Sequence, residues 1–314
     1  MNSRPFFLIY FLCALTGTPT TIIARARPLN SPPSNANAQP TNDSDLPEAI
    51  RSYADQPLQA LLRDYSELKG VKPAQDQSEL PEILRQVGEK VEAFFHDFSN
   101  TSSLEQVNEE YLKRDGKIKD SATLEFQYVC LTSPTPETPG LNEYRMGGDS
   151  EKRLLSQLML TSGFIAASLP FHPHYQSESN FRLIGWQIDD GRPVLVIAYA
   201  QRPDKSRLHG RFNMGAEGVD TFSQGFAWVD GATYQIIRMR TDLLTRFPKV
   251  RLDRETTVIR YGEVRFKNAS ARFWLPLQVT VIVEWQGRIF RNTHSYSDFK
   301  LFNVEATQRQ GKPQ

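Results

Sequence analysis

Apolar and polar side chains alternate along residues 272–285, and this is the clearest pattern in the chain. Every second position from Phe273 to Trp285 is apolar, and the positions on the other face include Arg272, Gln278, Thr280 and Glu284. Because successive side chains of a strand point to opposite faces, the pattern predicts a sheet with one apolar and one solvated face. Residues 123–131 alternate in the same way, whereas residues 193–200 are apolar at nearly every position, which predicts a strand covered on both faces.

The strands are predicted to pair antiparallel. About eight to ten of them follow residue 120, and they do not alternate with the crossover helices that a parallel sheet needs. Asp190-Gly191 and Asp230-Gly231 are turn sequences of the kind that joins adjacent strands. The part of the chain from 119 to 306 is therefore expected to be one antiparallel sheet.

Helical periodicity appears before the sheet and once within it. Apolar residues three and four apart predict helices in 47–69 and 80–98, and residues 102–112 are expected to continue as a third helix. These segments make 47–118 an N-terminal helical region. Residues 150–169 predict a helix inserted in the sheet, which is either a core helix or a lid whose apolar face meets a ligand.

The first residues have the pattern of a secretory signal peptide. A short apolar run follows Arg4, and Ala24-Arg25-Ala26 is a plausible cleavage site, which gives a signal peptide at 1–26. An uncleaved anchor is the alternative. Residues 27–46 are rich in Pro, Asn and Ser and predict a disordered tether, and 307–314 predict a disordered tail. The protein is thus expected to be exported to the periplasm or cell envelope.

Composition excludes some classes of function. The formal charge of +1 over 314 residues argues against a nucleic-acid binder, and the 39% of hydrophobic residues is ordinary for a globular chain. If the leader is removed, Cys130 is the one cysteine left, so core burial rather than an internal disulfide must stabilise the fold. Its apolar surroundings predict a buried thiol rather than a nucleophile.

Candidate chemistry is sparse. No nucleophile elbow, zinc-protease helix or phosphate-binding glycine loop occurs, and of the five histidines only His172 and His174 lie close together. Side chains two apart on an extended segment share a side, so this pair is a weak candidate for a metal site. A third ligand would have to come from Asp189, Asp190 or His209. The sequence therefore predicts no cofactor and no catalysis.

Three segments carry a resemblance to a known family. Residues 225–239 (GFAWVDGATYQIIRM), 272–288 (RFWLPLQVTVIVEWQGR) and 293–304 (THSYSDFKLFNV) resemble strands of the LolA/LolB superfamily, which includes outer-membrane lipoprotein-sorting proteins. The resemblance covers about 180–305. It implies an α+β fold in which a strongly curved antiparallel sheet, an unclosed half-barrel, is covered by helices. Carriers of this family hold acyl chains in the concave cavity without covalent catalysis.

The resemblance and the residue pattern suggest a ligand site. An apolar cavity would be lined by aromatic and aliphatic side chains with arginines at its mouth; the candidates are Trp228, Ile236, Arg238, Arg240, Phe273 and Trp285. In the alternative interpretation, the arginines belong to a solvated hairpin end and bind no ligand. The expected partner is a lipid or the acyl chains of a lipoprotein, and peripheral membrane contact and oligomeric state stay open.

Two other functions compete with lipid binding. One is an interaction scaffold with a filled core, and the other is a metal-dependent enzyme centred on His172 and His174. A hollow and a filled barrel share the same alternation of side chains, so the sequence does not separate them. A cavity of several hundred Å³ in the structure would distinguish the hollow barrel from the filled one.

Overall fold

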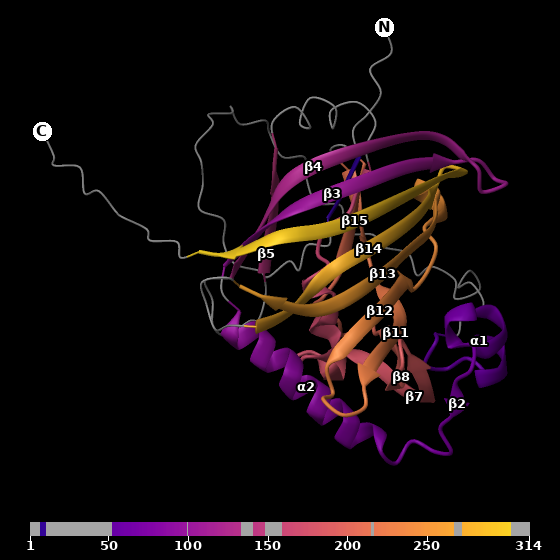
Figure 1. The fold of residues 1–314 in the computed structure, drawn as a ribbon. Helices are drawn as coiled ribbons and strands as arrows, with labels where there is room; N and C mark the ends of the chain where they lie inside the picture. The colour runs from indigo at the N-terminus through magenta and orange to yellow at the C-terminus, as the bar shows by residue number, and fades with distance from the viewer. Residues whose placement is uncertain are drawn as a thin grey trace, which may run out of the picture.

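The computed structural model describes residues 7–10, 52–98, 100–132, 141–147, 159–214, 217–266 and 272–302. Within these ranges the chain forms a large antiparallel sheet (Figure 1). Its eleven strands, in spatial order, are β2 (Lys72–Pro73), β7 (Ser179–Asp189), β8 (Arg192–Gln201), β11 (Ser223–Asp230), β12 (Ile236–Leu243), β13 (Leu252–Arg265), β14 (Arg272–Trp285), β15 (Arg288–Leu301), β3 (Thr101–Leu112), β4 (Ile118–Thr132) and β5 (Leu141–Met146). The end strands β2 and β5 do not pair, so the predicted antiparallel and unclosed sheet is confirmed.

Smaller elements surround the main sheet. A four-stranded sheet has the order β10 (Glu217–Thr221), β9 (Gly210–Met214), β1 (Phe7–Tyr10) and β6 (Met159–Leu160). The α-helices of the described residues are α1 (Leu58–Asp64) and α2 (Leu80–Asp97). Short 3₁₀ turns are η2 (Ser66–Leu68), η3 (Ala166–Phe171), η4 (Gln176–Glu178) and η5 (Pro248–Val250).

The main sheet has two faces with different coverings. We call the face against α2 the inner face; Ile83, Val87 and Val91 of α2 pack there against β8 and β12. We call the opposite face the outer face. At the β7–β8–β11 end the outer face is covered by residues 53–71, which contribute Tyr53, Leu61, Leu68 and Val71.

Two strand predictions show how the coverings shape the pattern. Strand β8 is covered on both sides, because Leu195 and Ile197 face α2 while Val194 and Val196 face residues 53–71. The prediction of a doubly covered strand is therefore confirmed. Strand β14 alternates as predicted except at Leu277, which is 40% exposed. The register with β13 shifts at this point, so Leu277 is an extra residue without a partner on β13.

The predicted helix at 102–112 is wrong. These residues belong to β3, which pairs antiparallel with β15 on one side and β4 on the other. Alternate positions from Thr101 to Glu109 are buried on the inner face. Cross-strand pairing overrode the local helical preference of a Glu- and Leu-containing segment, as sheet context often does. The predicted N-terminal helical region consequently does not extend through 101–118.

Two further helix predictions need correction. Residues 150–158 lie outside the described residues, but 159–169 form β6, an irregular stretch and the start of η3 instead of an α-helix. Gly163 has the left-handed φ of +90° and Pro170 lacks an N–H, so an α-helix is interrupted at both. In 47–69, the described part is helical only at α1 and η2, while α2 confirms the predicted helix at 80–98.

Other predictions concern residues that the structure does not describe. Of the predicted signal peptide only Phe7–Tyr10 is described, and the tether at 27–46 and the tail at 307–314 lie outside the described residues. These three assignments stay predictions. None of the helices in the described ranges is both long and apolar enough to cross a membrane.

Candidate functional site

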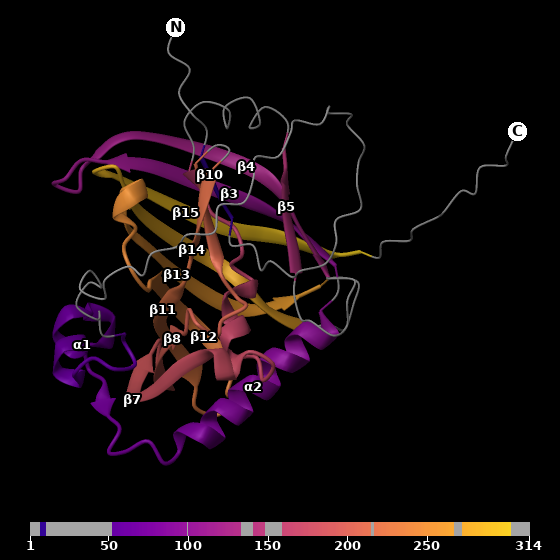
Figure 2. The same ribbon diagram turned by 180° about the vertical axis from the view of Figure 1, so that it is seen from behind.

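An irregular segment lies on the apolar part of the inner face. We call residues 161–171 the roof; they lie near α2 on the side of the sheet seen in Figure 2. Phe164 and Ile165 of the roof belong to one apolar cluster with Ile259 on β13 and Val279 and Val281 on β14. The roof contributes no long strand or α-helix of its own, so side-chain packing is its main contact with the sheet.

Hydrogen bonds link the roof to neighbouring strands. The backbone N–H of Gly163 donates to Oε2 of Glu143 on β5 at 2.7 Å. The hydroxyl of Tyr261 on β13 donates to the carbonyl of Phe164 at 3.2 Å. A buried irregular segment needs such partners for its backbone groups, because it lacks the regular backbone hydrogen bonds of a helix or a sheet.

The space between roof and sheet is small. It measures about 40 Å³, and its walls are Phe164, Ala166, Ala167 and Pro170 from the roof and Tyr199, Thr241, Thr257 and Ile259 from the sheet, with Leu208 and His209 beside them. Such a volume holds roughly three water molecules. Typical small-molecule pockets have about 300–1,000 Å³. In this conformation the apolar part of the inner face is therefore filled by the protein itself.

A buried charge cluster lies beside this apolar area. The carboxylate of Glu105 on β3 is fully buried and accepts hydrogen bonds from Arg145 at 2.5 and 2.8 Å. It also accepts from Nδ1 of His294 and from the Tyr296 hydroxyl, each at 2.8 Å. Burial alone would raise the pKa of Glu105, but the charge and hydrogen bonds of Arg145 and the bond from His294 outweigh it and lower the pKa to about 2. The carboxylate is thus held ionised.

Several buried polar atoms on the inner face have no hydrogen-bond partner. They include Nε2 of His294, Oε1 of Glu109, Oε1 of Glu255 and Oγ1 of Thr257. Because Nδ1–H of the neutral His294 ring donates a hydrogen bond to Glu105, Nε2 of this ring is an acceptor. Burial raises the pKa of Glu109 to about 8 and that of Glu255 to about 7. Sequence reasoning missed Glu105 and Glu109, since both fell in the segment predicted as a helix.

Replacing Glu109 by Gln is expected to stabilise the protein at alkaline pH. The pKa of the carboxyl is raised from 4.5 to about 8, so the folded state binds the extra proton between these values. The free energy of unfolding therefore falls as the pH rises through this window, by about 1.4 kcal/mol per pH unit at most. The neutral amide does not titrate. Urea unfolding at about pH 5 should give nearly equal free energies of unfolding for Glu109→Gln and the wild type. At about pH 9 the variant should be more stable than the wild type by on the order of 3 kcal/mol.

The control for this experiment is Glu92→Gln on the exposed side of α2. It makes the same chemical change in solvent, and its stability profile should run parallel to that of the wild type. Parallel profiles for Glu109→Gln as well would contradict a buried, proton-binding Glu109.

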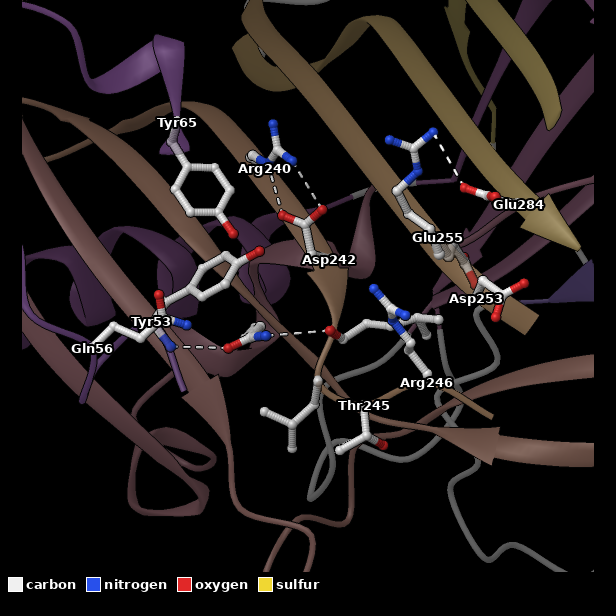
Figure 3. Close-up of a pocket in the computed structure, with 14 residues that line it drawn as sticks. Tyr53, Gln56, Tyr65, Arg240, Asp242, Thr245, Arg246, Asp253, Glu255 and Glu284 are labelled. Atoms are coloured by element: carbon white, nitrogen blue, oxygen red, sulfur yellow. Dashed lines mark hydrogen bonds and ion pairs between the residues drawn. The ribbon is translucent and has the colours of Figure 1, made fainter. Parts of the chain in front are cut away.

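A second and larger space lies at the ends of β12 and β13 (Figure 3). We call it the polar groove. Its volume is about 540 Å³, and its lining is Tyr53, Gln56, Tyr65, Gln224, Arg240, Asp242, Leu243, Leu244, Thr245, Arg246, Asp253, Arg254, Glu255 and Glu284. Charged groups of both signs therefore face one space large enough for a small molecule.

The structure does not bring the six predicted ligand residues together. Trp228, Arg238 and Arg240 lie on the outer side, where the Arg238 guanidinium stacks 3.8 Å from the centre of the Trp228 ring. Arg240 pairs with Glu67 and with Asp242. Ile236, Phe273 and Trp285 pack in the clusters of the inner face. The expected mouth arginines and the expected cavity lining are thus separated by the sheet, and a ligand role for these residues stays a prediction.

The histidine pair is close but is not joined by further ligands. His172 is buried, and its Nδ1 accepts a hydrogen bond from the backbone N–H of His174 at 3.1 Å. Within the part of the chain that the structure describes, no group of three His, Cys, Asp or Glu side chains could hold a metal ion. Cys130 is buried, as its sequence context predicts.

Comparison with known proteins finds similar solved structures at low sequence identity. No protein-family model matches the chain, and no curated protein matches its sequence. Similar solved structures include a putative outer-membrane lipoprotein-sorting protein domain from Vibrio parahaemolyticus, with 10% identity and a TM-score of 0.37 over 69% of this chain and 91% of that chain. A LolA superfamily protein from Nitrosomonas europaea has 12% identity and a TM-score of 0.35 over 71% and 94%. The lipoprotein LppX from Mycobacterium tuberculosis has 10% identity and a TM-score of 0.23 over 72% and 99%.

Two of these similar structures, a LolA superfamily protein and a putative lipoprotein-sorting protein domain, have the names of the family that residues 180–305 resemble. Because every one of these TM-scores is below 0.5, the similarities carry no argument about function. The function has to follow from the geometry of this chain.

Proposed function

We propose that the protein is a non-catalytic, exported binding protein that holds the acyl chain of a lipid or lipid-modified partner between the roof and the inner face of the sheet. The observation that supports this is an extended apolar surface covered by an irregular segment. Ile259, Val279 and Val281 lie under the roof side chains Phe164 and Ile165. An acyl chain that took the place of these roof side chains would meet the same apolar surface.

The energetics permit such an exchange. Burial of each methylene contributes about 0.8 kcal/mol, so ten methylenes would contribute on the order of 8 kcal/mol. The opposing cost is the loss of the roof contacts and of the two hydrogen bonds at Gly163 and Phe164. Each polar group that is left buried without a new hydrogen-bond partner costs about 1–3 kcal/mol. Binding therefore requires an open conformation, since the closed one leaves about 40 Å³.

A filled-core scaffold is the second candidate, and the same small volume favours it. If the roof never leaves the sheet, the apolar inner face is an ordinary core and the protein acts through its surface. The two functions make opposite predictions for lipid uptake.

Substituting Ala167 by Phe is expected to weaken lipid uptake. Ala167 lines the small space under the roof, and a phenyl ring there would occupy the position of the first methylenes of a ligand. Native mass spectrometry after incubation with a monoacyl phospholipid should show one added lipid mass on the wild type. The variant should bind at least about tenfold more weakly, which corresponds to 1.4 kcal/mol.

The matched control is Ala232→Phe, which adds the same ring in the exposed turn after β11. It should keep uptake and thermal stability. Absence of uptake by the wild type would leave the scaffold as the better function. Uptake that Ala167→Phe does not change would place the acyl chain elsewhere.

A further inference from the structure

A neutral histidine lies under the roof with one ring nitrogen unused. His294 on β15 is fully buried, and its Nδ1–H donates to Oε1 of Glu105 on β3 at 2.8 Å. Burial lowers the pKa of His294, so the ring carries no charge at neutral pH and its Nε2 is an acceptor. This Nε2 has no hydrogen-bond partner. The inner face therefore holds an unsatisfied acceptor on a residue that is otherwise fixed in place.

Glu109 lies beside this acceptor on the neighbouring strand. In the register of β15 with β3, His294 is opposite Val107. Glu105 and Glu109 therefore take the two diagonal positions on the same face. Diagonal neighbours are about 7–8 Å apart and within reach of long side chains. The bond from His294 to Glu105 shows this reach on one diagonal, and Glu109 lies on the other, on the side of His294 away from Glu105.

The carboxyl of Glu109 complements the histidine. Glu109 is 9% exposed, and its Oε1 has no hydrogen-bond partner. Burial raises the pKa of Glu109 to about 8 despite the opposing charge of Arg145, so at neutral pH the carboxyl is mainly protonated and can donate. Because Nε2 of His294 and Oε1 of Glu109 are both unpaired, these two atoms do not bond to each other. One group that both donates and accepts would satisfy them together.

The ring of Phe164 covers His294 in the closed protein. The two ring centres are 4.9 Å apart, and the ring planes meet at 66°. Phe164 is one of the roof side chains that the proposed acyl chain would replace, so the replacing chain would lie against His294. A chain made only of methylenes would leave the acceptor and the donor unpaired. A hydroxyl at this place would donate to Nε2 of His294 and accept from Glu109.

We propose that His294 and Glu109 form a subsite for a hydroxyl group of the bound lipid, which makes the ligand a hydroxylated acyl lipid. The inference rests on the proposed acyl-chain site and adds the chemical group that this site selects. A carboxylate offers no donor to Nε2, and an ammonium offers no acceptor to the Glu109 proton. Glu255 and Thr257 also have unpaired oxygens, but they lie on β13 and are separated from the pair by β14.

The test compares two pairs of lipids that differ in their hydroxyl groups. Ricinoleic acid has one hydroxyl in the middle of the chain that oleic acid lacks, and monoolein has the glycerol hydroxyls that methyl oleate lacks. Each pair is mixed in equal amounts with the full chain at neutral pH, and native mass spectrometry measures the ratio of the two bound masses. In at least one pair the hydroxylated member should be preferred at least about tenfold. A preference in the first pair identifies a hydroxylated chain as the source, and one in the second pair a glycerol head.

Glu109→Leu is the critical variant, because leucine is an apolar side chain without a donor. It should bind the lipid that lacks the hydroxyl as the wild type does, and it should lose the preference for the hydroxylated lipid. Glu109→Gln keeps an amide donor and should keep most of the preference. Each ratio is measured within one sample, so a general change in stability would lower both bound masses and leave their ratio unchanged.

His294→Phe tests the acceptor, with Tyr296→Phe as its matched control. Each variant removes one neutral donor to the Glu105 carboxylate, at 2.8 Å in both cases, but only the first also removes Nε2. The preference should be lost in His294→Phe and kept in Tyr296→Phe. Equal ratios in the two variants would contradict a role for Nε2.

The outcomes separate this inference from the proposed function. Uptake of both members of each pair in equal amounts would overturn the hydroxyl subsite and leave the acyl-chain site intact. A preference that Glu109→Leu does not change would place the hydroxyl elsewhere and would overturn the subsite as well. No uptake of any of these lipids would reject the acyl-chain site, and the subsite with it.

Discussion

Replacing Arg145 by Met is expected to destabilise the protein by about 3–5 kcal/mol, because it leaves the carboxylate of Glu105 buried without its charge partner. The Glu105 side chain is fully buried and that of Arg145 is 11% exposed. The hydrogen bonds from His294 and Tyr296 would remain but carry no formal positive charge. Urea unfolding at about pH 7 measures the loss.

The reciprocal variant Glu105→Gln should cost a similar amount, since it leaves the Arg145 guanidinium unpaired. The double variant should recover part of the loss, because neither charge is then left alone in the interior. The exposed pair of Arg85 with Glu82 on α2 is the control; its side chains are 54% and 57% exposed. Arg85→Met should cost less than about 1 kcal/mol. If Arg145→Met cost no more than Arg85→Met, the buried pair would not stabilise the fold.

The same pair predicts a loss of stability in acid. The pKa of Glu105 is lowered from 4.5 to about 2, so the unfolded state binds its proton first. The stability that Glu105 contributes is present above about pH 4.5 and is lost as the pH falls toward 2. Glu105→Gln should remove this part of the acid transition, which distinguishes the charge from the shape of the side chain.

Substituting Gly225 by Ala is the second large effect we expect. Gly225 lies in the middle of the sheet, paired with Tyr199 on β8 and Thr241 on β12. A Cβ at this position would lie 1.8 Å from the carbonyl oxygen of Arg240 and 2.8 Å from its carbon. Backbone in a central strand cannot move aside as a flexible side chain can, so two strands must separate. The cost should be about 4 kcal/mol or more, at the upper end of single substitutions.

Gly116→Ala provides the comparison. Gly116 has a φ of +81°, and a Cβ there meets nothing within 4 Å, so its substitution costs only backbone strain of about 1–2 kcal/mol. Thermal unfolding of both variants compares the loss of stability caused by the backbone contact at Gly225 with the loss caused by backbone strain at Gly116. A Gly225→Ala protein as stable as Gly116→Ala would mean that β11 and β12 lie further apart than described.

The acyl-chain site needs the roof to move, and uptake by the wild type tests this motion.

Much of the fold follows from periodicity. The alternation in 272–285 predicts β14 and its apolar face, and the continuous apolar run at 193–200 predicts the doubly covered β8. The three- and four-residue spacing in 80–98 predicts α2 and the side that it buries. In each case many positions repeat the same preference, so local pattern and tertiary packing agree.

The pattern fails where few positions carry it. In 102–112 the alternating buried residues include Ser103, Glu105 and Glu109, whose polar side chains hide the period of two. In 159–169 the apolar residues suggest a helix, but Gly163 breaks it and the neighbouring strands supply the packing. Both errors fall on segments that build the candidate site.

By itself, the sequence determined the antiparallel sheet, its apolar and solvated faces and the amphipathic α2, because these depend on repeated local preferences that sum along a segment. Tertiary structure alone decided that Glu105 meets Arg145 and His294 and that Glu255 is left unpaired. It also placed Arg240 against Asp242 and filled the inner face with the roof. Each of these contacts joins different elements, and a single pair of residues leaves no periodic signal in the chain.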